Sequence, residues 1–276
     1  MVERVILFVV DGLRPDGLLQ AQAPAMHGLL KRGAYTLEAQ SVMPSITLPC
    51  HVSMFHGVTP EVHGVTTNMW EPAPDGPIPG LFEVVRQAKR RPASFYTWEP
   101  LRDLSRPGAV AYSCMTDIYW PGEENSDLAI ARLAADYIVQ SRPDFTFVYL
   151  GLTDEVAHRY GWMSAEYLQA IAVADEGIGH VLERLAGAGL LEETACLVTS
   201  DHGGHDHRHG EDIPEDMTIP WVLAGPGIRP GCKLEGPVRI FDTAPTIARL
   251  LDLPIPAVWQ GRAALSGERL RVRRAG

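Results

Sequence analysis

The chain has 276 residues, of which 46% are hydrophobic and 21% charged, and its formal net charge is −10. This composition is typical of a globular protein and excludes fibrous and wholly disordered chains. The excess of acidic residues also disfavours a role in binding nucleic-acid polymers, whose phosphate backbones repel a negative surface.

Three apolar runs without polar alternation occur along the chain, and an aspartate follows each of them. The runs are VILFVV at residues 5–10, FTFVYL at 145–150 and ACLVT at 195–199. Continuous β-rich runs predict strands that are buried on both faces of a parallel sheet. Asp11, Asp154 and Asp201 are therefore expected beyond the carboxyl ends of these strands, where open parallel sheets bind ligands.

Helical patterns lie between the runs, at residues 127–140 with Ser126 as the predicted N-cap and at residues 165–186 with Ser164 as N-cap. Residues 219–224 and, more weakly, 95–98 predict further strands, and residues 242–251 predict a helix capped by Asp242. The alternation of strands and helices predicts an α/β fold with a mostly parallel central sheet flanked by helices.

No repeat or clear domain boundary interrupts the chain. We expect one catalytic domain over residues 1–276, with a candidate small cap around residues 68–122. Within that cap, residues 71–80 contain four prolines and predict an irregular loop. The arginines at 269, 271, 273 and 274 are interpreted as part of a solvated, frayed tail.

The segment after the third apolar run is rich in histidine. His202, His205, His207 and His209 fall within eight residues and lie among acidic side chains. Imidazole mixed with carboxylate is the ligand set of Zn, Mn or Fe sites, and the absence of paired cysteines argues against a thiolate zinc site. The alternative is a solvated loop that chelates metal adventitiously.

Asp154 and His158 are four residues apart, after the second run. If a helical turn begins there, both side chains lie on one face and can hold one ion. Taken alone, the Asp-x-x-x-His pattern is weak, and its position at a strand end is what favours a metal site.

The segment PSITLPCH at residues 44–51 predicts a helix start, with Thr47 as N-cap, Pro49 in the first turn and Gly57 as the stop. Backbone N–H groups at a helix start favour an anion such as a phosphate. Thr47 is either a simple capping residue or a nucleophile, and as a nucleophile it would need a metal to lower its pKa.

Together these motifs resemble the alkaline phosphatase superfamily, and specifically its type I phosphodiesterase/nucleotide pyrophosphatase branch, over nearly the whole chain. DGLRPD at residues 11–16 resembles the opening metal motif, residues 44–51 the nucleophile segment, and residues 60–68 the scaffold that follows it. Residues 153–158, SDHG at 200–203 and HGED at 209–212 resemble the later metal motifs.

The resemblance implies two divalent metal ions, usually zinc, with Mn or Fe as alternatives. One ion is expected to be held by Asp154, His158 and His209, with His205 and His207 as competing candidates for the last position. The other is expected at Asp11, Asp201 and His202, with the Thr47 hydroxyl beside it.

The chain departs from the family pattern at Cys50, where the branch usually has an asparagine that donates to a phosphoryl oxygen. Cysteine is a poor donor. The contact is therefore expected to be weaker or to come from the Thr47 backbone N–H or from Asn68, and the preference for diesters is open.

The resulting hypothesis is a metal-dependent hydrolase of phosphate esters, of the phosphodiesterase/nucleotide pyrophosphatase type, in which Thr47 attacks phosphorus and forms a phosphothreonine. The alternatives are a phosphomonoesterase, a phosphonate or phosphoglycerate-mutase-like enzyme on the same metal core, and a non-catalytic metal-binding protein. A sulfatase is disfavoured, because no Cys-x-Pro-x-Arg or Ser-x-Pro-x-Arg sequence stands at the nucleophile position.

Expectations about compartment and partners rest on the cysteines and on the first apolar run. Cys50, Cys114, Cys196 and Cys232 form no C-x-x-C pair and are interpreted as reduced thiols. Residues 5–10 are about a third of the length needed to cross a bilayer and carry no signal-peptide pattern. We expect a cytoplasmic protein that acts on a small phosphate ester or nucleotide, without a membrane or a nucleic-acid polymer as partner.

Overall fold

The computed structural model describes residues 2–70, 78–117 and 125–265. One eight-stranded sheet crosses the molecule in the order β4-β3-β5-β1-β6-β7-β2-β8. Its strands are β1 (Arg4–Val10), β2 (Ala34–Gln40), β3 (Pro92–Tyr96), β4 (Tyr112–Met115), β5 (Phe145–Leu150), β6 (Thr194–Thr199), β7 (Thr218–Ala224) and β8 (Cys232–Lys233). Only the two pairings of β7 are antiparallel, so the predicted mostly parallel α/β fold is confirmed.

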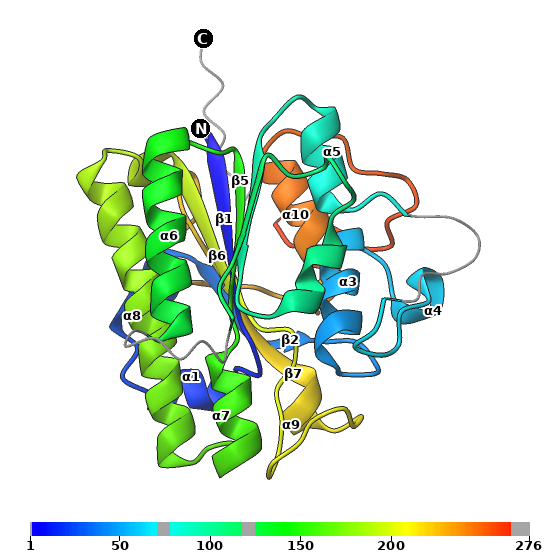
Figure 1. Cartoon of the computed structure of the whole chain (residues 1–276), viewed down its shortest axis with the longest axis vertical. Helices are drawn as coiled ribbons and strands as arrows, with labels where there is room; N and C mark the ends of the chain where they lie inside the picture. The colour runs from blue at the N-terminus through cyan, green and yellow to red at the C-terminus, as the bar shows by residue number, and fades with distance from the viewer. Residues whose placement is uncertain (1, 71–77, 118–124, 266–276) are drawn as a thin grey trace.

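Helices cover both faces of the sheet (Figure 1). On one face lie α6 (Ser126–Ser141) and α8 (Ala165–Gly187), and on the other α3 (Thr47–His56), α5 (Leu81–Gln87) and α10 (Thr243–Leu250). The shorter helices are α1 (Pro15–Gln20), α2 (Pro24–Arg32), α4 (Pro60–His63), α7 (Leu152–Tyr160) and α9 (Pro214–Met217). Alternate residues of β1 enter the two cores, Leu7 toward α3 and Phe8 toward α8, which explains the unbroken apolar run.

The topology brings the chemically interesting residues to one edge. Strands β5, β1 and β6 are parallel neighbours in the middle of the sheet, so Asp154, Asp11 and Asp201 follow three adjacent carboxyl ends. Strand β7 is antiparallel to β6, so the segment between them turns back at this same edge and carries the histidines with it. Strand β2 also ends here, shortly before α3.

Helix ends agree in part with the sequence predictions. The Ser164 side chain caps α8 by accepting from the Tyr167 N–H, as predicted. Helix α6 is capped by Asn125 and not by Ser126, which is already helical. Asp242 precedes α10 without a capping bond, because its carboxylate accepts instead from the N–H groups of Arg239 and Arg262.

The strand predictions also agree with the structure only in part. The weak strand expected at residues 95–98 is β3, shifted to Pro92–Tyr96, and β7 matches the run at 219–224 within one residue. Strands β2, β4 and β8 lie toward the sheet edges, carry polar or short sequences and were not predicted.

The structure describes residues 68–70 and 78–117 of the candidate cap. Strands β3 and β4 of this part belong to the main sheet, and Leu81, Phe82 and Val85 of α5 enter its core, while a small cap stays a prediction. Residues 71–77 of the proline-rich loop, residues 118–122 and the arginine tail lie outside the described residues. Among described helices, none combines the length and apolarity that a bilayer span requires.

A buried carboxylate joins the start of α6 to the start of α7. Asp127 is fully buried and accepts hydrogen bonds from the backbone N–H groups of Gly151 and Leu152, at 3.0 and 3.1 Å. Burial raises the pKa of Asp127 to about 7. In the unfolded chain that pKa returns to roughly 4, so the folded state binds an extra proton between about pH 4 and pH 7.

Stability should therefore fall by a few kcal/mol as pH rises through that window, and level off above it. Asp127→Asn cannot titrate, so we expect a smaller difference in unfolding free energy between pH 5 and pH 8 than in the wild type. Urea unfolding of both proteins in EDTA at the two pH values measures this. Equal differences in the two proteins would show that Asp127 is ionised throughout.

Candidate metal centre

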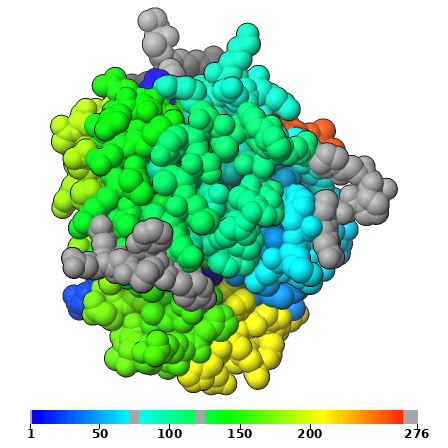
Figure 2. Space-filling model, in the orientation of Figure 1, coloured from blue at the N-terminus to red at the C-terminus, as the bar shows by residue number. Residues whose placement is uncertain are grey.

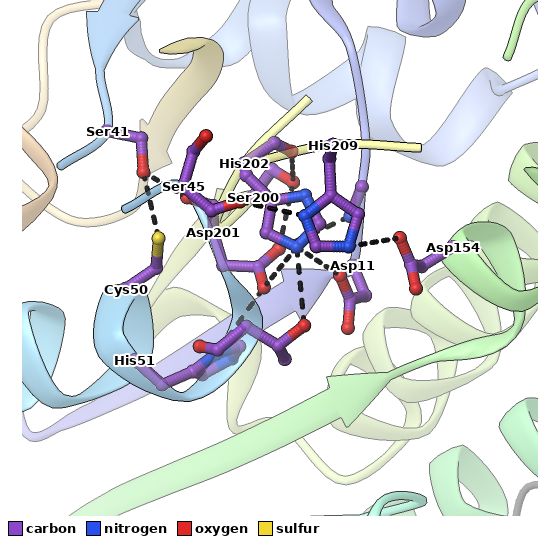
Figure 3. A network of polar contacts seen from close by, with 12 residues as sticks. Asp11, Ser41, Ser45, Cys50, His51, Asp154, Ser200, Asp201, His202 and His209 are labelled. Atoms are coloured by element: carbon purple, nitrogen blue, oxygen red, sulfur yellow. Dashed lines mark hydrogen bonds and ion pairs between the residues drawn. The ribbon is translucent and has the colours of Figure 1, made fainter. Parts of the chain in front are cut away.

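Two groups of potential metal ligands lie side by side at the carboxyl edge of the sheet (Figure 3). Asp11, Asp201 and His202 form one, and Asp154, His209 and the same His202 form the other. Within each group the ligand atoms all lie within 4.8 Å of one another. The first group is the one expected from the sequence, whereas the second draws on His202 in addition to Asp154 and His209.

Three imidazoles are oriented in the same way. Nδ1 of His202 contacts the carbonyl of Gly203 at 2.8 Å, Nδ1 of His209 that of Ser45 at 2.8 Å, and Nδ1 of His158 that of His207 at 2.9 Å. Each Nδ1 therefore carries the proton and donates it to a backbone carbonyl. The three Nε2 atoms are turned toward carboxylates, which is the arrangement of histidines that bind a metal through Nε2.

The carboxylate oxygens opposite these nitrogens lack hydrogen-bond donors. Buried oxygens of Asp11 (Oδ1), Asp154 (Oδ1) and Asp201 (Oδ2) have no hydrogen-bond partner. They lie 3.4, 3.8 and 3.4 Å from the Nε2 atoms of His202, His209 and His202 respectively. Lone pairs on both sides, with no proton between them, are costly when buried but suit a divalent cation. The donor set therefore fits two such ions.

The electrostatics of the site are consistent with this fit. Burial, together with the charges of Asp201 and Asp154, raises the pKa of Asp11 well above its usual value, and burial also raises that of Asp201. Burial lowers the pKa of His209 to about 4, with a further contribution from His202, so His209 is neutral at pH 7. Three crowded carboxyl groups beside the neutral imidazoles of His202 and His209 form an acidic pocket, and a divalent cation would relieve the repulsion that raises these carboxyl pKa values.

His158 lies at the outer side of this pocket. Its Nε2 is 3.3 Å from Asp154 Oδ2, and its side chain is 40% exposed. The hydrogen bond to Asp154 raises the pKa of His158 to about 9. For Asp154, burial raises the pKa, but the contacts with His158, His202 and His209 outweigh burial and lower it. Helix α7 thus places Asp154 and His158 on one face, as the i, i+4 spacing predicts.

The Thr47 hydroxyl points into the site. Thr47 is the first residue of α3, whose N-cap is Ile46, and its side chain makes no capping bond. Its Oγ1 lies 3.3 Å from His202 Nε2, and the side chain is buried. Gly57 ends the helix at φ 63°, in the left-handed region that glycine adopts readily, as the sequence predicts. The structure therefore disfavours a simple capping role for Thr47.

His205 and His207 take other positions. His205 Nδ1 is 2.8 Å from Asp216 Oδ1, and its Nε2 accepts from Arg208 at 3.1 Å, so both of its nitrogens are engaged. His207 is exposed, and its Nδ1 contacts the carbonyl of His158 at 3.2 Å. Of the three candidates left open by the sequence, His209 is the one whose Nε2 faces Asp154.

The structure also separates the two candidate substrate contacts. The Cys50 thiol is fully buried, lies 3.2 Å from Ser41 Oγ, and has a raised pKa because of that burial. The thiol is thus engaged inside the protein, and a contact between Cys50 and substrate stays a prediction. Asn68 instead is exposed, and its Oδ1 accepts from the Leu48 N–H at 3.0 Å, beside Thr47.

Sequence reasoning missed two residues that hold ligands in place. The Tyr149 hydroxyl donates to Asp11 Oδ2, which leaves Oδ1 of that carboxylate facing His202. His51 donates from Nδ1 to the carbonyl of Thr47 at 2.8 Å and lies 3.5 Å from Asp201. A tyrosine in an otherwise apolar buried strand was the available signal, because a buried hydroxyl needs a partner.

Metal removal should destabilise the protein, because the folded state alone assembles the ligands. At free ion concentrations about 100-fold above the dissociation constants, two ions stabilise the fold by about 5 kcal/mol. We expect EDTA to lower the Tm by on the order of 10 °C, and zinc to restore it. Differential scanning calorimetry measures the shift. An unchanged Tm would argue against both ion sites.

Comparison with known proteins finds one matching family and several relatives of low sequence identity. A sequence model described as "Type I phosphodiesterase / nucleotide pyrophosphatase" matches residues 5–218. Human ectonucleotide pyrophosphatase/phosphodiesterase family member 1 is 27% identical over 228 residues, which are 72% of this chain and 23% of the relative. GPI ethanolamine phosphate transferase 1 of Neurospora crassa is 26% identical over 269 residues, and the match covers 82% of this chain and 26% of the relative. The chain thus spans about a quarter of the length of these relatives.

The fold is shared with solved structures of low sequence identity. The structure of murine ectonucleotide pyrophosphatase/phosphodiesterase 5, described as an inactive threonine-to-alanine variant in complex with AMP, has a TM-score of 0.77 to this chain. The likeness covers 92% of this chain and 96% of that one, at 16% identity. The sheet and its flanking helices are therefore alkaline-phosphatase-like.

Proposed function

Because the chain belongs to the type I phosphodiesterase/nucleotide pyrophosphatase family, we propose that it hydrolyses phosphate esters, with Thr47 as nucleophile and two divalent metal ions, zinc before Mn or Fe, as cofactors. One observation carries the proposal. The Thr47 hydroxyl lies 3.3 Å from His202 Nε2, the atom common to both ligand groups, so the hydroxyl and both ion sites adjoin one point.

The assignment of ligands follows the contacts. Asp11, Asp201 and His202 would hold one ion, and Asp154, His158 and His209 the other. When bound, the ions supply positive charge that lowers the pKa of the Thr47 hydroxyl and of water and neutralises the phosphoryl group.

The residues of the chain supply the nucleophile and orient the phosphoryl group. Thr47 Oγ1 loses its proton and attacks phosphorus, so that the Oγ1–P bond forms as the bond from phosphorus to the leaving alcohol's oxygen breaks, and that oxygen takes up a proton. Water then cleaves the Oγ1–P bond, which releases the phosphate product and restores the Thr47 hydroxyl. Helix α3 begins at Thr47, so its N-terminal dipole favours the phosphoryl oxygens beside the nucleophile. Asn68 Oδ1 is occupied by the Leu48 N–H, so the NH₂ end of that amide is the one left to donate to a phosphoryl oxygen.

The substrate class is proposed as a small phosphodiester or nucleotide. The names of the ectonucleotide relatives and the AMP in the murine structure support this choice. The test is hydrolysis of bis-p-nitrophenyl phosphate against p-nitrophenyl phosphate, with added Zn or Mn and with an EDTA control. A higher kcat/KM for the diester supports the proposal, and a higher value for the monoester supports the phosphomonoesterase alternative.

One further outcome bears on the remaining alternative of a non-catalytic protein. Metal binding without turnover of either ester, or of phosphonate and nucleotide substrates, would support a non-catalytic metal-binding protein.

A cytoplasmic location is retained as a proposal because Cys50, Cys114, Cys196 and Cys232 are all free. Cell fractionation tests it.

A further inference from the structure

The segment at residues 203–211, here called the His-rich loop, connects the ligand His202 to helix α9 and carries the ligand His209. In Figure 2 the yellow surface formed by this part of the chain packs beside the green surface of α7. His205 also lies in this loop but has no ligand role in the function proposed above. The contacts of His205 lead to Asp216, on α9.

Asp216 holds the loop on both sides of His209. Its side chain is fully buried. One oxygen, Oδ1, accepts from His205 Nδ1 at 2.8 Å, and the other, Oδ2, accepts from the Glu211 N–H at 2.8 Å. Residues 205 and 211 flank His209, so a single carboxylate fixes the loop before and after the ligand.

The contacts of His205 determine its tautomer. Its Nε2 accepts from Arg208 Nε at 3.1 Å, so the proton resides on Nδ1 and is donated to Asp216. The backbone of His205 also exchanges two hydrogen bonds of 2.9 Å with that of Arg208, which closes a tight turn. With both ring nitrogens used, His205 acts as a link within the protein and has no lone pair left for a metal.

Other anchors complete the placement of the loop. The N–H groups of Gly203 and Gly204 donate to the carbonyls of Asp216 and Glu215, at 2.7 and 2.8 Å. A Cβ at Gly203 would stand 2.0 Å from the Glu215 carbonyl oxygen, so only glycine allows this approach. Beyond the loop, Ser45 Oγ donates to the Glu211 carbonyl at 3.2 Å. His209 can therefore face Asp154 only while the loop keeps this position.

We propose that Asp216 is a positioning residue which, through His205 and the Glu211 N–H, sets the affinity for the metal ion held by Asp154, His158 and His209. The inference rests on the proposed two-metal function. It assigns His205, one of the two histidines of the sequence motif that have no ligand role, to orientation of the loop. The Asp216 carboxylate bonds to His205 and to the Glu211 N–H, so among the described residues it acts through the loop and not as a ligand.

Asp216→Asn tests the proposal, because its NH₂ group replaces one of the two oxygens, so that either His205 or the Glu211 N–H loses its acceptor. Zinc titration by calorimetry or with a competing chromophoric chelator should show two tight ions in the wild type. In the variant we expect the affinity for one ion to fall roughly 10- to 100-fold, while the other ion, at Asp11, Asp201 and His202, stays tight. Glu215→Gln, the neighbouring exposed carboxylate on α9, is the matched control and should bind as the wild type.

His205 variants keep the test decisive if Asp216→Asn does not fold. His205→Gln retains an N–H that can donate to Asp216, whereas His205→Ala removes it. We expect His205→Ala to lower the affinity for the ion at Asp154, His158 and His209, and His205→Gln to retain most of the wild-type affinity for that ion.

The outcomes separate this inference from the function on which it rests. A wild-type protein that binds fewer than two ions would contradict the proposed function. A wild type with two tight ions, and Asp216→Asn or His205→Ala with both affinities unchanged, would overturn the role of Asp216. A glutamine variant that loses the ion as fully as His209→Ala would also overturn it, because His205 would then be a ligand.

Discussion

Thr47→Ala is expected to lower kcat by at least about a thousand-fold, because it removes the hydroxyl that lies 3.3 Å from His202 Nε2 and that we propose as the nucleophile. Metal content should stay at the wild-type value, since all the carboxylate and imidazole ligands remain. Turnover of bis-p-nitrophenyl phosphate, together with metal analysis of the same sample, measures both quantities.

Thr47→Ser is the matched control, because it keeps a hydroxyl at the start of α3 and should retain a measurable part of the activity. Rapid quenching of the wild type with labelled substrate should also trap a phosphoryl group on Thr47. Full activity of the alanine variant would refute Thr47 as nucleophile, and the metal site would then need another attacking group.

His202→Ala and His209→Ala should each remove a ligand from a different ion. In the proposed assignment His202 belongs with Asp11 and Asp201, and His209 belongs with Asp154 and His158. We expect each variant to bind its own ion more than about 100-fold more weakly and to keep the other ion, because an imidazole nitrogen has one lone pair and binds one ion. Activity should fall by about a thousand-fold or more in both variants, because both ions are needed at the phosphoryl group.

Metal content after gel filtration at limiting free zinc measures this loss, and each variant should retain one ion. His180→Gln, a half-exposed position on α8, serves as a control for the loss of a histidine and should keep two ions. If the His202 variant kept two tight ions, His202 would not be a metal ligand, and the proposed assignment would be wrong.

Local sequence patterns were sufficient for the central part of the fold. The runs at residues 5–10, 145–150 and 195–199 are strands β1, β5 and β6, because unbroken apolar sequence is stable as a strand only where both faces are covered. The edge strands β4 and β8 were missed because four and two residues are too few to show a periodicity. Helix caps were predicted with mixed success, since Asn125 and Ser126 are both capable capping residues and only the backbone geometry chooses between them.

The sequence by itself determined which residue types are available: three aspartates that follow buried strands, an Asp-x-x-x-His pair, a cluster of histidines and a threonine at a helix start. Only the tertiary structure decided how they combine. The antiparallel course of β7 returns the His-rich loop to the edge where Asp11, Asp154 and Asp201 lie, and it is the Asp216 contact that separates His205 from His209. The first outcome depends on the direction of a neighbouring strand, and the second depends on how the loop folds back onto α9, and neither is encoded in the spacing of the histidines.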